Sequence, residues 1–320
     1  MVVFVIFVGI LFAISLSLSV DEVEARFGVS FLKEERSYRS NVIRSNLVFI
    51  DAENRKYHSY TLGVTPFIFL TTEEFADYVS TRSLVDPSIH SKSVKCLNRR
   101  HARSFVDWRK RGVFSPITNQ GSCGSCYAMA TAELTATALR IAGKKVDLLS
   151  SQQVVDCSRA YGNSGCSGGS LLYSLKYINN TGLVTDTEYP YTGKETPCAV
   201  PKQGRFKPSD FKCYSAIDET SLQSLVASGP VSVAIYGSWA PLQHYRSGVL
   251  SGDCSGGVDH AVMVVGFDEM VADSNEVIPY WILRNSWGPD WGEGGYFRLE
   301  RDTGGLGMCE LGYSVFTASA

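Results

Sequence analysis

The chain has 320 residues, of which 44% are hydrophobic and 19% are charged. One compact core rarely holds so many residues, so we expect at least two folded units with ample apolar material. The formal net charge of −2 argues against nucleic acid or an anionic membrane surface as a partner.

The N-terminal segment joins an apolar run, residues 2–14, to the small-residue tail Ser15-Leu-Ser-Leu-Ser19. A spanning helix needs about 20 apolar residues, and the serines end this run sooner. The segment is typical of a secretory signal peptide over residues 1–19, with an uncleaved anchor as the alternative. No later stretch is long and apolar enough to span, so no stable membrane insertion is expected.

Residues 34–54 are expected to form a helix with an apolar stripe of Tyr38, Val42, Leu47 and Ile50. The run Thr71-Thr-Glu-Glu74 is typical of a capping box that opens a short helix with Phe75 and Tyr78. Residues 85–103 are polar and irregular, which predicts an exposed linker suited to proteolytic maturation.

The remaining chain changes its pattern midway. Residues 126–143 are helical, with one apolar face and Gly143 as a stop; that face holds Met129, Ala132, Ala136 and Leu139. From about Gly229 onward, four short β-type runs stand between glycine-rich turns: residues 231–236, 261–265, 280–283 and 295–299. The acidic stretch 268–279 is expected to be a surface loop. The fold class is therefore α+β, with a helical half, a β half and a cleft between them.

The most informative segment is Gln120-Gly-Ser-Cys-Gly-Ser-Cys126-Tyr127. It places Cys126 after a glycine-bearing turn and at the start of a helix. A helix N-terminus carries roughly half a positive charge, which stabilises a thiolate and makes the sulfur a nucleophile. Gln120 lies upstream, where its amide can donate to an oxyanion.

Two downstream segments supply the other parts that acyl transfer requires, a proton carrier and a group that orients it. His260 is the expected base and later acid, and Asn285 is expected to hold its ring. Trp287 would cover that hydrogen bond. Gln120 and the backbone N–H of Cys126 would form the oxyanion hole. His244 is the other histidine after the linker, and we expect it at the surface or in a structural role.

Simpler interpretations exist for each residue. A helical cysteine usually packs in a core, and Asn-Ser-Trp-Gly can be an ordinary turn. Cys123-Gly-Ser-Cys126 could be a redox pair or half of a zinc site, but the flanking pattern is not thioredoxin-like and no second metal-binding motif follows. The occurrence of Cys126, His260 and Asn285 in this order favours a catalytic site, and we expect it to use no cofactor and no metal.

Together these residues resemble the papain-like cysteine peptidases, over a stretch from about Glu35 and then nearly all of residues 106–314. The resemblance implies a helical left domain, a β-barrel-like right domain, a prodomain over residues 20–102 and a peptidase domain over residues 103–320. The cathepsin L-like prodomain helix is matched by Glu35, Arg39, Asn46, Ile50 and Asn54, with Ile43 where Phe is usual.

A second prodomain motif, G-x-N-x-F-x-D, is half present. Gly63 and Phe67 fit it. Thr65 and Phe69 stand where the family has Asn and an Asp that is often linked to acid-triggered release. Tyr127 replaces the commoner Trp beside the nucleophile, as an allowed variant.

The resemblance also implies further site residues. Gly168 and Gly169 would bind substrate backbone, and Trp287 would be a further substrate-binding residue. The pocket for the second residue before the scissile bond would be small and apolar, lined by Ser170, Leu171, Ala234, Val258, Ala261 and Ser314. The implied disulfides are Cys123–Cys166, Cys157–Cys198 and Cys254–Cys309, which leave out Cys96 and Cys213. Asn179 opens a potential N-glycosylation sequence.

These observations predict a secreted or lysosomal/vacuolar cysteine endopeptidase made as an inactive zymogen. Its partners would be protein or peptide substrates, its own prodomain as an intramolecular inhibitor and cystatin-like inhibitors, and it would be a monomer that binds no nucleic acid. The sequence has no insertion with paired histidines that could block the cleft, which favours an endopeptidase. The alternatives are an exopeptidase of the same chemistry and an inactive homologue that acts as a binding protein.

Overall fold

The structure is a computed structural model that describes residues 18–79, 105–200, 205–272 and 274–320. Most of the predicted signal peptide, the predicted maturation linker and Cys96 lie outside the described residues. Across the described ranges, no helix has the length and apolar character needed to cross a membrane.

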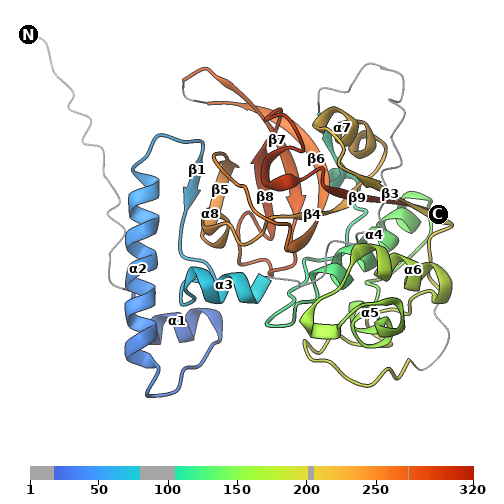
Figure 1. The fold of residues 1–320 in the computed structure, drawn as a ribbon, viewed down its shortest axis with the longest axis horizontal. Coiled ribbons are helices and arrows are strands. Elements are labelled where there is room, and N and C mark those ends of the chain that lie inside the picture. Colours follow the sequence, from blue (N-terminus) through green and yellow to red (C-terminus); the bar gives the residue numbers. More distant parts are fainter. Residues whose placement is uncertain (1–17, 80–104, 201–204, 273) are drawn as a thin grey trace, which may run out of the picture.

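The elements fall into three groups along the chain (Figure 1). The N-terminal group consists of α1 (Val20–Phe27), α2 (Arg36–Asn54), β1 (Tyr60–Leu62) and α3 (Thr72–Val79). The left domain contains α4 (Cys126–Ile141), α5 (Ser151–Cys157) and α6 (Leu171–Thr181). The right domain contains β2 (Val106–Asp107), β3 (Asp210–Ser215), α7 (Glu219–Ser228), β4 (Val231–Ile235), α8 (Ala240–Gln243), β5 (Tyr245–Leu250), β6 (His260–Val271), β7 (Val277–Arg284), β8 (Tyr296–Glu300) and β9 (Ser314–Ser319).

Helices α2 and α3 form where the sequence predicts them, whereas α1 was not predicted. Thr71 and Glu74 make the reciprocal bonds of a capping box, from Thr71 N–H to the Glu74 carboxylate (2.9 Å) and from Glu74 N–H to Thr71 Oγ1 (3.1 Å). The predicted stripe of α2 needs one correction. Tyr38 is 49% exposed, whereas Ile43 is fully buried, because Ile43 lies on the same helical face as Leu47 and Ile50.

This group docks on the right domain through backbone pairing and buried amides. Strand β1 pairs antiparallel with β5, which extends the sheet by one strand. Thr65 is fully buried, and its hydroxyl donates to the Gln243 carbonyl at 2.8 Å. The Gln243 amide in turn donates to the carbonyls of Phe67 and Leu70. Uncharged hydrogen bonds therefore hold the segment where the family motif is only half kept.

Helix α4 lies at the boundary between the left and right domains. The sequence predicts one apolar face, but every residue from Cys126 to Leu139 is buried. The reason is that α4 packs against α5 and α6 on one side and against β6 and β9 of the right domain on the other. Alanine and threonine along the helix permit this close approach from two sides.

The strands of the right domain pair in the order β1-β5-β8-β7-β6-β4-β9-β3, with β2 added beside β6. In the described part of the chain this is an open sheet whose ends are β1 and β3, so the predicted barrel-like right domain is not a closed barrel.

The prediction of a surface loop at 268–279 is wrong. Strands β6 and β7 continue through it as a hairpin, from Asp268 opposite Tyr280 to Val271 opposite Val277. Asn275 supplies the left-handed conformation (φ 64°) that the tight turn needs, a conformation that asparagine tolerates better than most residues.

Candidate active site

Cys126 is the first residue of α4, and it is buried. The turn that leads into it is tied to the left domain by the Cys123–Cys166 disulfide and by a hydrogen bond from Gly124 N–H to the Cys166 carbonyl (2.9 Å). Cys126 belongs to none of the three disulfides of the described chain. Because Cys123 is bonded to Cys166, the C-x-x-C segment is not a redox pair.

His260 begins β6 and Asn285 follows β7, so neighbouring strands of the sheet bring them together. His260 Nε2 lies 2.8 Å from Asn285 Oδ1. The same oxygen accepts the Ser286 backbone N–H at 2.8 Å, which identifies it as the acceptor. Nε2 therefore carries a proton, and Nδ1 is the ring nitrogen left for proton exchange. Nδ1 is buried and makes no hydrogen bond within the protein.

Burial controls the charge of this histidine. His260 is fully buried, and burial lowers its pKa to about 4, although the hydrogen bond to Asn285 acts in the opposite direction. At neutral pH the imidazole of this covered form is therefore neutral.

Trp287 lies over the His260–Asn285 pair. Its ring stacks on His260 with centroids 4.7 Å apart and planes inclined by 27°. Trp291 contacts the same indole edge to face at 4.7 Å. Trp287 is 1% exposed, so the hydrogen bond beneath it is shielded from water and is stronger for that reason.

Gln120 spans the two domains. Its N–H donates to the Ser286 carbonyl (2.9 Å), and its side-chain oxygen accepts from Ser286 Oγ (2.9 Å). The amide nitrogen must therefore point the other way, where it donates to the Cys123 carbonyl at 3.2 Å. A side-chain amide has two hydrogens, so Gln120 keeps a second donor on the side of Cys123.

The N-terminal group covers this site. Phe67 and Phe75 pack edge to face on Trp287, with ring centroids 5.2 and 5.4 Å from it. Tyr78, near the end of α3, lies 5.1 Å from Phe67. Burial raises the pKa of Tyr78, and Tyr191 of the left domain adds to the rise. The end of α3 thus lies close enough to Tyr191 for the two phenols to interact electrostatically.

The predicted substrate residues are buried in the covered form. Leu171, Ala234, Val258 and Ala261 belong to one apolar cluster with Cys126, and Ala234 and Ala261 are cross-strand partners. Ser170 caps α6 by accepting the Leu172 N–H (3.1 Å), while the buried hydroxyl of Ser314 makes no hydrogen bond.

The two glycines of the predicted backbone-binding strip, Gly168 and Gly169, are both buried. At the second position, Gly169, packing alone requires a glycine. A Cβ on Gly169 would lie 2.5 Å from Asn163 Oδ1 and 2.7 Å from the Tyr127 ring. The Tyr127 hydroxyl donates to the Gly165 carbonyl at 2.9 Å, which holds this ring in place. Gly169 is therefore needed to let this strip lie against Tyr127.

Outside the strip, the structure contains the disulfides Cys157–Cys198 and Cys254–Cys309 in addition to Cys123–Cys166. Asn179 is exposed in the last turn of α6. His244 is not at the surface, since it is 1% exposed and its ring lies 5.9 Å from that of Phe49 in α2.

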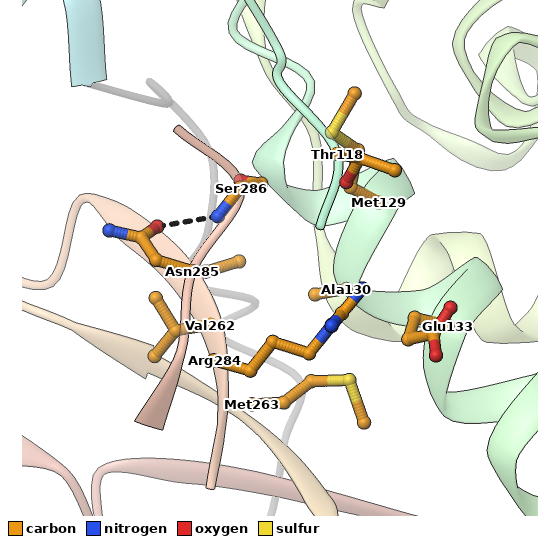
Figure 2. Close-up of a pocket in the computed structure, with 10 residues that line it drawn as sticks. Thr118, Met129, Ala130, Glu133, Val262, Met263, Arg284, Asn285 and Ser286 are labelled. Carbon is orange, nitrogen blue, oxygen red and sulfur yellow. Dashed lines mark hydrogen bonds between the residues drawn. The ribbon is translucent and has the colours of Figure 1, made fainter. Parts of the chain in front are cut away.

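A small cavity of about 20 Å³ lies behind the site, between α4 and the strands of the right domain (Figure 2). Its lining includes Glu133, Met263 and Arg284. In Figure 2 the amide of Asn285 points away from Ala130 and Glu133 of α4. The volume suits about one water molecule. It is an inner cavity at the domain boundary and not the place where a peptide would bind.

Sequence reasoning missed several residues that shape the site. Tyr191 contacts both Gln120 and Ser125. Asp259 accepts from Gly237 N–H (2.6 Å) and from the Ser238 hydroxyl, which fixes the loop beside His260. A Cβ on Gly237 would lie 2.4 Å from His260 Cβ, so glycine is required there. Only the position of Asp259 next to His260 hinted at such a role.

The structure combines a cysteine at a helix N-terminus, a buried histidine hydrogen-bonded to an asparagine, and an N-terminal helical segment packed on the tryptophan that stacks on this histidine. This combination defines a cysteine peptidase in its proform. The family model described as papain family cysteine protease matches residues 102–319. The chain belongs to the papain family of cysteine proteases.

Its relatives agree with this assignment. The chain is 36% identical over 295 residues to germination-specific cysteine protease 1 of Arabidopsis thaliana, covering 88% of this chain and 76% of that protein. It is 38% identical over 282 residues to a cathepsin L-like proteinase of Phaedon cochleariae, covering 85% and 84%. The structure of digestive procathepsin L 3 from Tenebrio molitor larval midgut matches with a TM-score of 0.80 and 29% identity, covering 94% and 97%. That structure is a proform, as the covered site here implies.

Proposed function

We propose that the chain is the zymogen of a cysteine endopeptidase in which Cys126 is the nucleophile, His260 the acid and base, and Asn285 the residue that orients the imidazole. The observation that carries the proposal is the buried 2.8 Å contact between His260 Nε2 and Asn285 Oδ1. It leaves Nδ1 as the ring nitrogen that exchanges a proton with the thiol at the start of α4.

The reaction then follows from these groups. The Cys126 thiolate attacks the scissile carbonyl, and the oxyanion that forms accepts from the Gln120 amide and the Cys126 N–H. Nδ1–H of the imidazolium protonates the leaving amine as the C–N bond breaks, which leaves a thioester. Water, deprotonated by Nδ1, attacks that thioester and releases the acid and the thiol. Asn285 keeps Nε2–H engaged throughout, so the ring does not rotate between steps.

The covered form disfavours the charged pair. Taking an imidazolium out of water is costly, and burial lowers the pKa of His260 to about 4. Phe67 and Phe75 contribute to this burial because they close the outer side of Trp287. Removal of the N-terminal group would admit water, raise the pKa of His260 and favour the thiolate–imidazolium pair. The prodomain therefore inhibits in two ways, by occupying the cleft and by keeping the pair neutral.

An epoxide-type thiol inactivator tests the assignment. After maturation, we expect one equivalent of label on Cys126 and complete loss of peptidase activity. The Cys126→Ser variant should take up no label at that site and should be inactive from the start. Cys213, which is half-buried in β3, serves as the internal control. Label on Cys213 with activity retained, or a mature wild-type enzyme without activity, would count against the proposal.

We also propose a preference for Leu, Val or Phe in the second position before the scissile bond. The pocket assigned to that residue is small and apolar, and no carboxylate is assigned to its floor. Short peptides with Leu there should be cleaved at least 10-fold faster than peptides with Arg, since an unpaired guanidinium is costly to desolvate. The Ser314→Glu variant should narrow or reverse this ratio, because it adds a carboxylate to the pocket. Faster cleavage of the Arg peptide by the wild-type enzyme would show that the pocket is wrongly assigned.

Internal cleavage of a long peptide, rather than stepwise release of dipeptides, distinguishes the proposed endopeptidase from an exopeptidase. An inactive homologue that only binds would cleave neither. We further propose that the protein is secreted or vacuolar and carries a glycan on Asn179, which is exposed. A glycosidase-sensitive change in mass, absent from the Asn179→Gln variant, would test the glycan.

A further inference from the structure

Tyr191 is half-buried, and its hydroxyl contacts both ends of the turn from Gln120 to Ser125 that leads into α4. Its hydroxyl donates to the backbone carbonyl of Gln120 at 2.7 Å. The same hydroxyl lies 2.6 Å from Ser125 Oγ, at the N-cap of α4. The Tyr191 hydroxyl is therefore hydrogen-bonded both to Gln120, the proposed oxyanion donor, and to Ser125, which precedes the proposed nucleophile.

The direction of these bonds follows from counting protons. A phenol has one hydrogen, and a carbonyl oxygen can only accept. Tyr191 must therefore donate to the Gln120 carbonyl. The single hydroxyl hydrogen of Ser125 then goes to Tyr191 at 2.6 Å rather than to the Cys123 carbonyl, which lies 3.4 Å away. Burial raises the pKa of Tyr191 to about 12, and a charge on Cys126 adds to the rise. The phenol thus remains a donor over the whole range in which a peptidase works.

Within the described part of the chain, the other hydrogen bonds of Gln120 come from the right domain and from its own turn. Ser286 accepts its N–H and donates to its side-chain oxygen, and the Cys123 N–H reaches its carbonyl at 3.4 Å. The Tyr191 bond is the shortest of the contacts to that carbonyl, and it comes from the left domain, which also holds Cys126. It fixes Gln120 relative to the nucleophile, whereas Ser286 fixes it relative to His260 and Asn285.

We propose that Tyr191 is a positioning residue of the oxyanion hole, which sets the distance between the Gln120 amide and the start of α4. It acts through the Gln120 carbonyl and the Ser125 hydroxyl, to which its own hydroxyl is hydrogen-bonded. This inference rests on the proposed function. Because a displacement of about 1 Å can cost up to 10²-fold in rate, a loosened Gln120 is expected to be costly even though its donor remains.

The Tyr191→Phe variant tests the role. After titration of active sites, kcat for peptide amide hydrolysis should fall at least 10-fold while KM changes less than 2-fold, because a developing oxyanion exists only in the transition state. Alkylation of Cys126 by iodoacetamide forms no oxyanion. Its rate and its pH profile should therefore match those of the wild-type enzyme, which a general loosening of the active site would not allow.

Tyr189→Phe is the matched control. It removes a phenol two residues away whose hydroxyl donates to Asp156 Oδ2 at 2.9 Å, and it should leave kcat within 2-fold of wild type. An unchanged kcat in Tyr191→Phe, or a fall matched by equally slow alkylation, would overturn the inference. Failure of the wild-type enzyme to titrate at Cys126 would instead overturn the proposed function itself, so the two failures are distinguishable.

Discussion

Replacement of Gln120 by Ala should lower kcat by about 10²–10³-fold, the usual cost of removing one oxyanion-hole donor. The side-chain oxygen of Gln120 already accepts from Ser286, so its amide nitrogen, which donates to the Cys123 carbonyl, is the group left to act as the proposed oxyanion donor. That donor matters most when negative charge develops on the carbonyl oxygen, so KM should change little. Steady-state kinetics with a peptide amide substrate, normalised to titrated active sites, provides the measurement.

A matched control separates catalysis from stability. Gln153 is also buried, and its amide donates to the Tyr177 hydroxyl and the Gly182 carbonyl, both at 2.9 Å. Gln153→Ala should lower the free energy of unfolding by about 1–3 kcal/mol, since it leaves buried groups unsatisfied, yet the folded enzyme should keep its kcat. If Gln120→Ala behaved as Gln153→Ala does, Gln120 would have only a structural role.

Local sequence signals predicted the parts of the site that depend on local structure. The glycine-bearing turn and the apolar helix after it place Cys126 at the first residue of α4, where the structure has it. The capping box formed by Thr71 and Glu74 was also predictable from the sequence, because its two partners are only three residues apart. His260 and Asn285 were found by motif, and their 2.8 Å contact depends on pairing between β6 and β7.

Features that depend on long-range packing were not predictable in this way. Tyr191 lies 66 positions from Ser125 in a segment without periodicity, so nothing local indicated the contact. The acidic stretch after Phe267 looked like a loop because its strand residues are few and its turn residue, Asn275, lies in the middle. The sequence left open whether His244 lies at the surface or has a structural role, since Phe49 of α2, whose ring packs near it, comes almost 200 positions earlier.

His244 should make release of the prodomain sensitive to acid. Its ring is 1% exposed, its Nδ1 makes no hydrogen bond, and its backbone carbonyl accepts the Gly63 N–H at 2.8 Å. Burial lowers the pKa of His244 to about 3. A histidine in water has a pKa of about 6.5. Because Phe49 and Gly63 belong to the N-terminal group, its departure should return His244 to that ordinary value.

The sign of the effect follows from these two values. His244 binds a proton less well when the N-terminal group covers it than when that group has left. The N-terminal group therefore binds the right domain most tightly above pH 6.5, where His244 is neutral in both forms. This binding weakens as the pH falls through 6.5 toward 3, by at most 10-fold per pH unit. Between pH 7.5 and 4.5 the equilibrium for opening should rise by up to about 100-fold. Thr65 is buried and uncharged at the interface, so it cannot supply this response.

Other titratable groups near the interface act separately. Burial opposes ionisation of Glu74, but the hydrogen bonds and charge of Arg39 outweigh it and lower the pKa of Glu74. His260 shifts in the same direction as His244 and would respond in parallel. The Arg246 side chain packs along Gly63, whose N–H is bonded to the His244 carbonyl. The acidic residues of α2 already have partners, because Asp51 pairs with Arg55 and Glu53 pairs with Lys56. Burial alone accounts for the shift in the pKa of His244.

The His244→Phe variant isolates the contribution of His244 because it keeps an aromatic ring against Phe49 and removes the titrating nitrogen. In the intact chain Cys126 is buried, so a small thiol reagent should label it only after the prodomain has moved away. The ratio of the wild-type to the variant labelling rate therefore measures the ratio of their equilibrium constants for prodomain release. We expect that ratio to rise at least 10-fold from pH 7.5 to 4.5. His58→Phe, which removes the prodomain histidine stacked on Tyr60, should give a constant ratio. A constant ratio for His244→Phe would mean that the ring stays buried when the prodomain leaves, and acid release would then rest on Glu74 and His260 instead.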